Sequence, residues 1–220
     1  MKVDILLGLQ WGDEGKGKIV DFLGKKYDII GRFQGGPNAG HTIKFNGNTH
    51  VLHTIPSGIF QTKTNNLIGN GVVIDPIIFS EELDKLKKNK ILFQKNLFIS
   101  RKAHLIMPTH RYLDAASELV KGNKKVGSTL KGIGPTYMDK TGRNGLRIGD
   151  IESKTFIKKF KSLTEKHNKI LEKYYNYKNP NQKKDENIWL KSITRLKKLN
   201  IVDGEYFINN KKGSKILAEG

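Results

Sequence analysis

Apolar and polar positions follow a regular order over the first 35 residues. Residues 3–7 form a short apolar run that ends at Gly8, which predicts a buried strand. Apolar residues at helical spacing over 18–23 predict a helix that ends at Gly24. Residues 28–33 form a second apolar run and predict a second strand. A strand, a glycine-rich loop, a helix and a strand are the opening of a βαβ unit.

The pattern after the second strand predicts further strands joined by tight turns. Residues 42–45 and 49–55 flank the pair Asn46-Gly47, which is favoured in two-residue β-hairpins. Residues 67–74 are largely apolar, and Gly69-Asn70-Gly71 interrupts them, which predicts a strand with tight turns.

Helical periodicity begins next and returns in the last third of the chain. Asp75 is a suitable N-cap and Pro76 a suitable first helical residue. Phe79, Leu83 and Leu86 form the apolar stripe of the helix that follows. The pattern also predicts a strand at 97–100, a helix at 112–121, a glycine-rich loop over 122–149, a mostly helical region at 151–200 with a polar break at 176–186, and a strand at 215–218.

The order of these elements predicts an α/β fold with a mainly parallel central sheet. A P-loop-like glycine-rich loop would follow the first strand, and a helical segment would occupy the C-terminal third. The loop over 122–149 contains seven glycines and little periodicity. A connection this long inside a compact domain is usually functional or disordered.

Composition narrows the class of protein without identifying it. Hydrophobic residues make up 36% of the 220 residues, and no run of 18 apolar residues occurs. The N-terminus carries no long apolar segment before a small-residue cleavage site, so we expect neither a transmembrane helix nor a signal peptide. Cysteine is absent, which excludes a disulfide scaffold and a cysteine nucleophile within this sequence.

The net charge of +19 would suit a protein that binds nucleic acid. Residues 1–150 carry 23 basic and 13 acidic groups, a net +10, and residues 151–220 carry 17 and 8, a net +9. The excess is therefore not gathered into one arm or patch, and we expect no nucleic-acid partner. Steep salt dependence of binding to DNA or RNA would revive that alternative.

The segment from Gly12 to Lys18 matches the G-x-x-x-x-G-K pattern of a phosphate-binding loop. Glycines let backbone N–H groups turn toward an anion, a helix N-terminus adds a positive dipole, and lysines add charge. Ile19 stands where such a loop usually has the Ser or Thr that binds magnesium, and Asp13 is the nearest candidate to replace it. A carboxylate here would repel a phosphate unless a cation or a proton-transfer role offset the repulsion. The alternative is a surface turn of mixed charge.

Several segments together resemble the adenylosuccinate synthetase family. Gln10–Lys18 is similar to the family's signature, and Gln34–Thr42 resembles its second motif. The resemblance covers nearly all of residues 1–150 in order and, more loosely, the helical region up to Gly220. The other segments that are similar to the family are 53–58, 69–73, 132–135 and 140–150.

The resemblance implies a ligase that uses GTP to join L-aspartate to IMP through 6-phosphoryl-IMP, in the synthesis of AMP. It implies that Asp13 is the general base that removes the N1 proton of IMP and also binds Mg²⁺. It implies that His41 is the general acid near the transferred phosphoryl group, and that the backbone carbonyl of Gly40 also binds the metal. The residues that it implies for binding GTP or its phosphates are Gly12, Asp13, Glu14, Gly15, Lys16, Gly17, Lys18, Gly40, His41 and Thr42.

The same resemblance implies a set of IMP contacts and a partner. Arg143 is expected to reach the IMP phosphate of a neighbouring subunit, which implies a homodimer with shared sites in the cytoplasm, without a membrane partner. Leu130 departs from the family, which often has Gly or Lys there, and this affects the loop near Thr129. The implied IMP-binding residues are Asp13, Lys16, Asn38, Ala39, Gly40, His41, Thr129 and Arg143.

Family members are about twice as long as this sequence. The resemblance therefore implies that residues 1–220 are the N-terminal portion of a single α/β nucleotide-dependent ligase domain, with 151–200 a mostly helical subregion. We expect this portion alone to be inactive, or to bind IMP or phosphate weakly. The alternative is a GTP-binding regulatory module that uses the glycine loop without ligase chemistry. A guanine-specificity motif such as Asn-Lys-x-Asp would favour that alternative, and the sequence has none.

Overall fold

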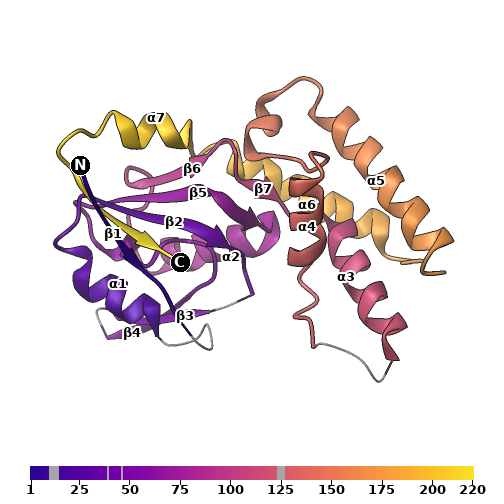
Figure 1. Ribbon diagram of the computed structural model, residues 1–220, viewed down its shortest axis with the longest axis horizontal. Coiled ribbons are helices and arrows are strands. Elements are labelled where there is room, and N and C mark those ends of the chain that lie inside the picture. The colour runs from indigo at the N-terminus through magenta and orange to yellow at the C-terminus, as the bar shows by residue number, and fades with distance from the viewer. Residues whose placement is uncertain (10–14, 39, 46, 123–126) are drawn as a thin grey trace.

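The computed structural model describes residues 1–9, 15–38, 40–45, 47–122 and 127–220 (Figure 1). In these ranges a seven-stranded sheet has the strand order β1-β9-β2-β5-β6-β8, and β7 pairs with the end of β5. Every pairing in this sheet is parallel, so the predicted α/β fold with a mainly parallel sheet is confirmed. Its strands are β1 (Lys2–Leu6), β2 (Ile29–Gly35), β5 (Asn65–Ile74), β6 (Leu97–Ser100), β7 (His104–Leu105), β8 (Asn200–Val202) and β9 (Lys215–Glu219).

Helices surround the sheet and extend beyond one end of it (Figure 1). The predicted hairpin is present as the antiparallel pair β3 (His41–Phe45) and β4 (Asn48–Leu52). None of the helices in the described ranges is long and apolar enough to cross a membrane. The helices are α1 (Lys16–Gly24), η1 (Ser57–Phe60), α2 (Pro76–Lys88), α3 (Pro108–Val120), α4 (Ile133–Thr141), η3 (Ile148–Glu152), α5 (Phe156–Lys173), α6 (Gln182–Leu196) and α7 (Gly204–Asn209).

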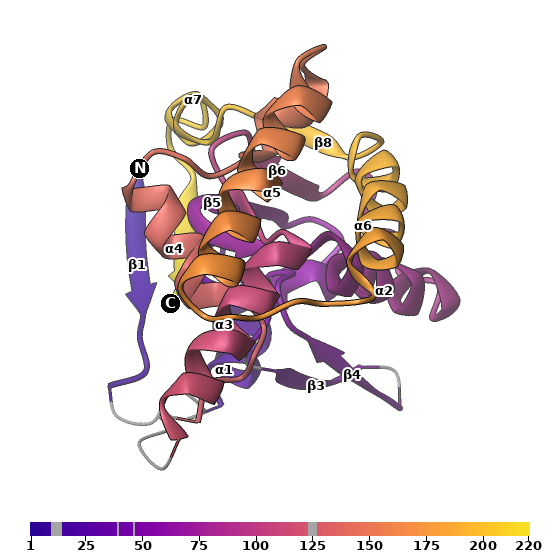
Figure 2. The same ribbon diagram turned by 90° about the vertical axis from the view of Figure 1, so that its right-hand side faces the viewer.

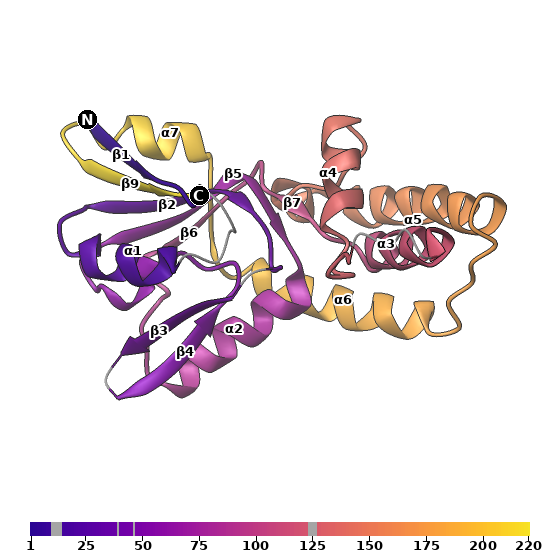
Figure 3. The same cartoon turned by 60° about the horizontal axis from the view of Figure 1, so that its bottom comes forward.

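The two faces of the sheet are covered by different elements (Figure 3). α1, α2 and the β3–β4 hairpin lie on one face, and α7 lies on the other. Successive residues of a strand point to opposite faces. Ile30 accordingly packs with Val20 of α1 and Leu217 of β9, whereas the preceding Ile29 packs on the side of Phe207 in α7.

The helices beyond the sheet pack around Trp189, which is 1% exposed. Its ring stacks on Phe160 with 5.0 Å between centroids, and its Nε1–H donates to the carbonyl of Ile106 at 2.7 Å. The apolar faces of α5 and α6 therefore pack against each other. In Figure 2 α5 and α3 lie side by side at this end of the molecule.

The prediction that the first strand is buried is wrong. Among the described strands β1 pairs only with β9, and it lies at the outer edge of the sheet (Figure 2). Its inner face packs through Leu6 against Val20 and Leu217, but Val3 is 47% exposed and Ile5 64% exposed on the other face. An apolar run cannot distinguish a central strand from an edge strand whose second face is uncovered.

The prediction of a glycine-rich loop over 122–149 is also wrong in part, because α4 begins at Ile133. Gly132 adopts a left-handed conformation (φ 74°) directly before this helix, and Pro135 falls in its first turn, where a backbone N–H is not needed. Because glycine and proline occupy the start of this helix, the periodicity of the sequence did not predict it.

The predicted tight turns at Gly69 and Gly71 are instead part of the continuous strand β5. A Cβ on Gly71 would lie 2.1 Å from the carbonyl oxygen of Phe33, and one on Gly69 would lie 2.9 Å from that of Arg32. The pairing register of β2 and β5 shifts at this point. These glycines therefore allow two backbones to approach at an irregular pairing. The structure also adds β7, β8 and α7, which are too short to give a pattern in the sequence.

Candidate functional site

A cavity of about 660 Å³ opens at the carboxyl ends of β2 and β9, beside Gly71 of β5. This edge of a parallel sheet is where α/β proteins bind their ligands. Three residues predicted to act on substrates, Lys16, Asn38 and His41, line it together. The other lining residues are Arg32, Phe33, Gln34, Gly35, Gly71, Tyr137 and Gly220.

The start of α1 packs directly against His41. Gly15 has a left-handed backbone (φ 84°) and begins the helix. Gly17 is buried, and a Cβ on it would lie 2.7 Å from Cβ of His41 and 3.1 Å from Oγ of Ser57. The glycine at this position therefore allows the end of the phosphate-binding loop to touch the imidazole-bearing strand. Lys18, one residue later, is exposed and is absent from the cavity lining.

The His41 ring is fixed on one side by buried polar groups. Its Nδ1 lies 2.8 Å from Oε1 of Glu219 and 3.1 Å from Oγ of Ser57. The Ser57 hydroxyl donates to Oε1 of Glu219 at 2.8 Å, and the Ser57 backbone N–H donates to Oε2 at 3.1 Å. β3, η1 and β9 thus meet at one carboxylate.

Arg32 of β2 is buried beneath the glycine turn that follows this strand. Its guanidinium donates to the carbonyl of His53 and, at 3.2 Å, to that of Gly36. Burial lowers the pKa of Arg32 from its ordinary value, against the opposing influence of Glu219 and Glu82. The guanidinium therefore holds the turn in place from below and brings a positive charge to the cavity wall.

Glu82 of α2 lies behind this turn and is 1% exposed. Its carboxylate accepts the backbone N–H groups of His53 at 2.5 Å and Thr54 at 3.1 Å. Burial raises the pKa of Glu82, and the hydrogen bonds from these amides oppose the rise. Glu82 thus secures the segment that follows β4.

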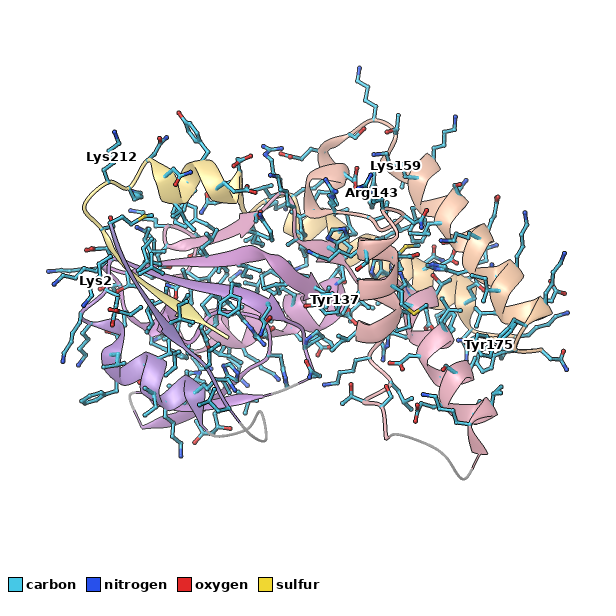
Figure 4. The ribbon with its side chains drawn as sticks, in the orientation of Figure 1. Lys2, Tyr137, Arg143, Lys159, Tyr175 and Lys212 are labelled. Carbon is cyan, nitrogen blue, oxygen red and sulfur yellow. The ribbon has the colours of Figure 1, made fainter. Side chains whose placement is uncertain are left out.

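Tyr137 of α4 also lines the cavity, and Figure 4 shows it between α4 and the sheet. The Tyr137 hydroxyl donates to the carbonyl of Gly71 at 2.7 Å and accepts the N–H of Gly35 at 3.1 Å. Lys131, just before α4, donates to the carbonyl of Pro37 at 2.8 Å. The glycine-rich region after α3 is therefore bound to the second motif, which periodicity alone did not indicate.

The other predicted site residues have different surroundings. Gly12, Asp13, Glu14 and Ala39 lie outside the described residues. Gly40 and Thr42 are exposed on either side of His41. Thr129 is exposed and is absent from the cavity lining, and the adjacent Leu130 has a left-handed backbone (φ 55°), which explains why glycine would suit that position.

Arg143 lies in a separate cavity of about 610 Å³ between the end of α4 and α5. Lys158, Lys159 and Lys166 also line this cavity, and Figure 4 shows Arg143 beside Lys159. Lys159 pairs with Asp150 at 2.6 Å, so part of the positive charge is neutralised within the chain. The structure therefore does not bring Arg143 to the cavity that holds His41.

In the part of the chain that the structure describes, His110, Asp139 and His167 form a cluster with the composition of a metal site. Nε2 of His110 lies 3.0 Å from Oδ2 of Asp139, and Nε2 of His167 lies 2.8 Å from it. The backbone N–H of Met107 donates to Nδ1 of His110 at 3.0 Å, so the proton of the neutral ring must sit on Nε2. A protonated nitrogen cannot bind a metal, and the cluster is better explained as a hydrogen-bond network.

This network joins α3, α4 and α5. Burial lowers the pKa of His110 to about 4, more than the hydrogen bond to Asp139 raises it. Burial would raise the pKa of Asp139, but the hydrogen bonds from both histidines hold it well below its usual range. Asp139 is therefore the anion on which the helices converge.

Sequence reasoning missed four residues of the cavity and its wall, namely Arg32, Ser57, Tyr137 and Glu219. Glu219 gave the clearest signal, because a carboxylate at the end of an apolar strand falls on the ligand-binding edge of a parallel sheet. The strand itself was predicted, but its place between β1 and β2 was not, since strand order is a tertiary property.

Comparison with known proteins agrees with this arrangement. The sequence model of the family described as adenylosuccinate synthetase matches residues 5–220. The adenylosuccinate synthetase of Christiangramia forsetii is 60% identical over all of this chain and 52% of its own length, and that of Flavobacterium johnsoniae is 59% identical over the same shares. The chain thus spans about half the length of the curated relatives it matches.

Two solved structures are similar over the whole chain. A fully ligated adenylosuccinate synthetase from Plasmodium falciparum has a TM-score of 0.83 and 36% identity, and 51% of it is covered. The succinoaminodeoxyadenylate synthetase of cyanophage S-2L, bound to dGMP and dATP, has a TM-score of 0.64 and 22% identity, again with 51% covered. The second likeness shows the fold alone.

Proposed function

The chain belongs to the adenylosuccinate synthetase family, and from that premise we propose that it supplies one half of an adenylosuccinate synthetase. The reaction joins L-aspartate to IMP at the expense of GTP, in the synthesis of AMP. The observation that carries the proposal is the cavity at the carboxyl edge of the sheet, where Lys16, Asn38 and His41 meet. No observation favours a regulatory GTP-binding module.

The chemistry requires two steps, because the 6-oxygen of IMP is a poor leaving group. In the first, loss of the N1 proton lets this oxygen attack the γ-phosphorus of GTP, which gives 6-phosphoryl-IMP and GDP. In the second, the amino group of aspartate attacks C6 and expels inorganic phosphate. The site must therefore accept a proton from the purine and stabilise negative charge on the phosphoryl group.

Different residues of this chain accept the proton and stabilise the phosphoryl charge. Asp13 is the general base for the N1 proton. His41, packed against the start of α1, is the general acid beside the transferred phosphoryl group. Lys16 and the N-terminus of α1 favour the phosphate charge. Asn38 contacts IMP from the same cavity wall.

The proposed cofactor is Mg²⁺, held by the Asp13 carboxylate and the carbonyl of Gly40. The described part of the cavity fits this assignment, because Gly40 is exposed beside His41, and the carboxylate of Glu219 is already engaged by Ser57 and His41. None of the described lining residues carries a carboxylate side chain, and the assignment of Asp13 as the carboxylate ligand rests on the family motif. When bound, the ion neutralises phosphate charge.

We further propose that the enzyme is a cytoplasmic homodimer with shared active sites. Arg143 lies in its own basic cavity, apart from His41. A second copy could present its IMP phosphate to that cavity. Arg143 and Lys158 line it and form no ion pair with any described residue, and their positive charge suits a phosphate.

The experiment joins this chain to the part of the Christiangramia forsetii synthetase that it does not match. This chimera should form adenylosuccinate only with GTP, IMP and aspartate, and His41→Asn should lower kcat by about 100-fold. His50→Gln is the matched control, because His50 packs on Phe60 and does not line the cavity. A folded chimera without turnover would refute the proposal. Full turnover by the 220-residue chain alone would refute the part of the proposal that gives this chain only one half of the enzyme.

A further inference from the structure

We propose that Glu219 is the positioning residue of His41. Its carboxylate receives the Nδ1–H of the imidazole, fixes the tautomer and the plane of the ring, and leaves Nε2 as the nitrogen that serves the cavity. The inference deepens the proposed function, in which His41 is the general acid, and rests on it.

The carboxylate is built into the fold rather than resting on its surface. The Glu219 side chain is fully buried, and that of His41 is 9% exposed, with Nδ1 and Oε1 2.8 Å apart. The Ser57 hydroxyl donates to Oε1 and the Ser57 backbone N–H to Oε2. Donors at both oxygens prevent rotation of the carboxylate, so the direction in which it meets the imidazole is fixed.

This arrangement determines where the imidazole carries its proton. Burial alone would raise the pKa of Glu219, but the hydrogen bond from His41, the positive charges of His41 and Arg32 and the Ser57 amide hold it below its ordinary value. Glu219 is therefore ionised at neutral pH and can only accept hydrogen bonds. Nδ1 must then be the donor, and Nε2 is the atom that can address a phosphoryl oxygen in the cavity that His41 lines.

The buried anion also suits the charge that His41 must carry. A general acid gives up its proton when negative charge develops on the substrate, so its protonated form must be available beforehand. A fixed carboxylate on the far nitrogen stabilises the imidazolium and orients it, as the aspartate of a Ser-His-Asp triad does. A neutral amide of the same shape would supply neither the charge nor a unique tautomer.

A merely structural role for Glu219 would be to fasten β9 to η1 through Ser57. The two roles differ in what they predict for the ring. A fastening role predicts loss of stability on substitution, with no specific change in the protonation of His41. A positioning role predicts that the Nδ1 proton is lost or shared even where the chain stays folded.

The first measurement is ¹⁵N NMR of the 220-residue chain labelled at histidine, with the His41 signals assigned from a His41→Asn sample. We expect a protonated Nδ1 in the unsubstituted chain and its loss or averaging in Glu219→Gln. Glu82→Gln is the matched control, because Glu82 is equally buried but its carboxylate is bound by the amides of residues 53 and 54. An unsubstituted chain with the proton on Nε2 alone would overturn the proposal without any variant.

The second measurement is turnover by the chimera described above. Glu219→Gln should lower kcat on the order of 100-fold while KM for GTP and IMP changes little. An unchanged kcat in a folded variant would overturn the positioning role.

The two proposals can fail separately. If Glu219→Gln alters the Nδ1 signal but His41→Asn retains full turnover, the contact is real and the assignment of His41 as general acid is wrong. If His41→Asn abolishes turnover but Glu219→Gln leaves both the Nδ1 signal and kcat intact, the proposed function stands and the positioning role falls.

Discussion

Two glycines in equivalent positions should respond in opposite ways to the same substitution. Gly17 and Gly134 are each the second residue of a nine-residue helix that follows a left-handed glycine. A Cβ on Gly134 would meet nothing within 4 Å, whereas one on Gly17 would lie 2.7 Å from Cβ of His41. The pair therefore separates the effect of backbone entropy from that of packing.

The magnitudes follow from these distances. Alanine in place of a compatible glycine raises the free energy of unfolding by about 0.4–1 kcal/mol, because the unfolded chain loses freedom. Gly134→Ala should show that gain alone. At Gly17 the neighbour is the Cβ of His41, which no change of rotamer can move, so β3 must shift. Overpacking of this kind costs about 1–3 kcal/mol, and Gly17→Ala should be destabilising by roughly 1–2 kcal/mol net.

The assay is urea unfolding of the 220-residue chain and its two variants, with thermal unfolding as a second measure. For a chain of this size a change of 1 kcal/mol moves Tm by about 2–4 °C. We expect a higher midpoint for Gly134→Ala and a lower one for Gly17→Ala, with changed NMR signals of His41 in the second variant only. Two variants of equal stability, or a stabilised Gly17→Ala, would show that α1 does not press against His41.

Three other results are expected. Trp189→Phe should lower the free energy of unfolding by about 1–3 kcal/mol in urea titrations, because the buried carbonyl of Ile106 loses its donor; an unchanged midpoint would contradict the hydrogen bond. The free energy of unfolding should fall as the pH drops from 6.5 to 4, because burial lowers the pKa values of His104 and His110 to about 4 and the unfolded chain therefore binds protons first. Each histidine contributes up to roughly 3 kcal/mol to this fall. A free energy of unfolding that stays constant over this pH range would argue against their burial. Asp139→Asn should be destabilising by about 1.5–3 kcal/mol, because two buried histidines lose their charged hydrogen-bond acceptor; an unchanged midpoint in the same titration would mean that the helices do not depend on it.

The sequence predicts those elements whose own residues determine them. The helix at Asp75 and Pro76 begins as its capping residues indicate, with the Asp75 carboxylate accepting the N–H of Ile77. The sequence did not predict α4, because this helix is stabilised by contacts with distant residues, such as the hydrogen bond from Tyr137 to Gly71. β1 was misjudged because burial depends on which strand lies beside it.

The same distinction between local and distant determinants applies to the candidate site. The motif residues Lys16, Asn38 and His41 were predicted, and the structure brings them to one cavity. Glu219 was not predicted, because it is 178 residues from His41 in sequence (219 less 41) and only the order of strands brings the two together. Asp13 lies outside the described residues, and its role stays a prediction.

The place of β9 between β1 and β2 has a consequence for synthesis on the ribosome. β1 and β2 cannot enter one sheet until the segment around residue 217 has left the ribosome, because β9 pairs with both of them. Until then the apolar residues of these strands in the nascent chain stay uncovered. Such late, non-local pairing is slow and leaves a target for chaperones. The same insertion delivers the carboxylate beneath His41, so the sheet closes and the imidazole acquires its anion in a single event.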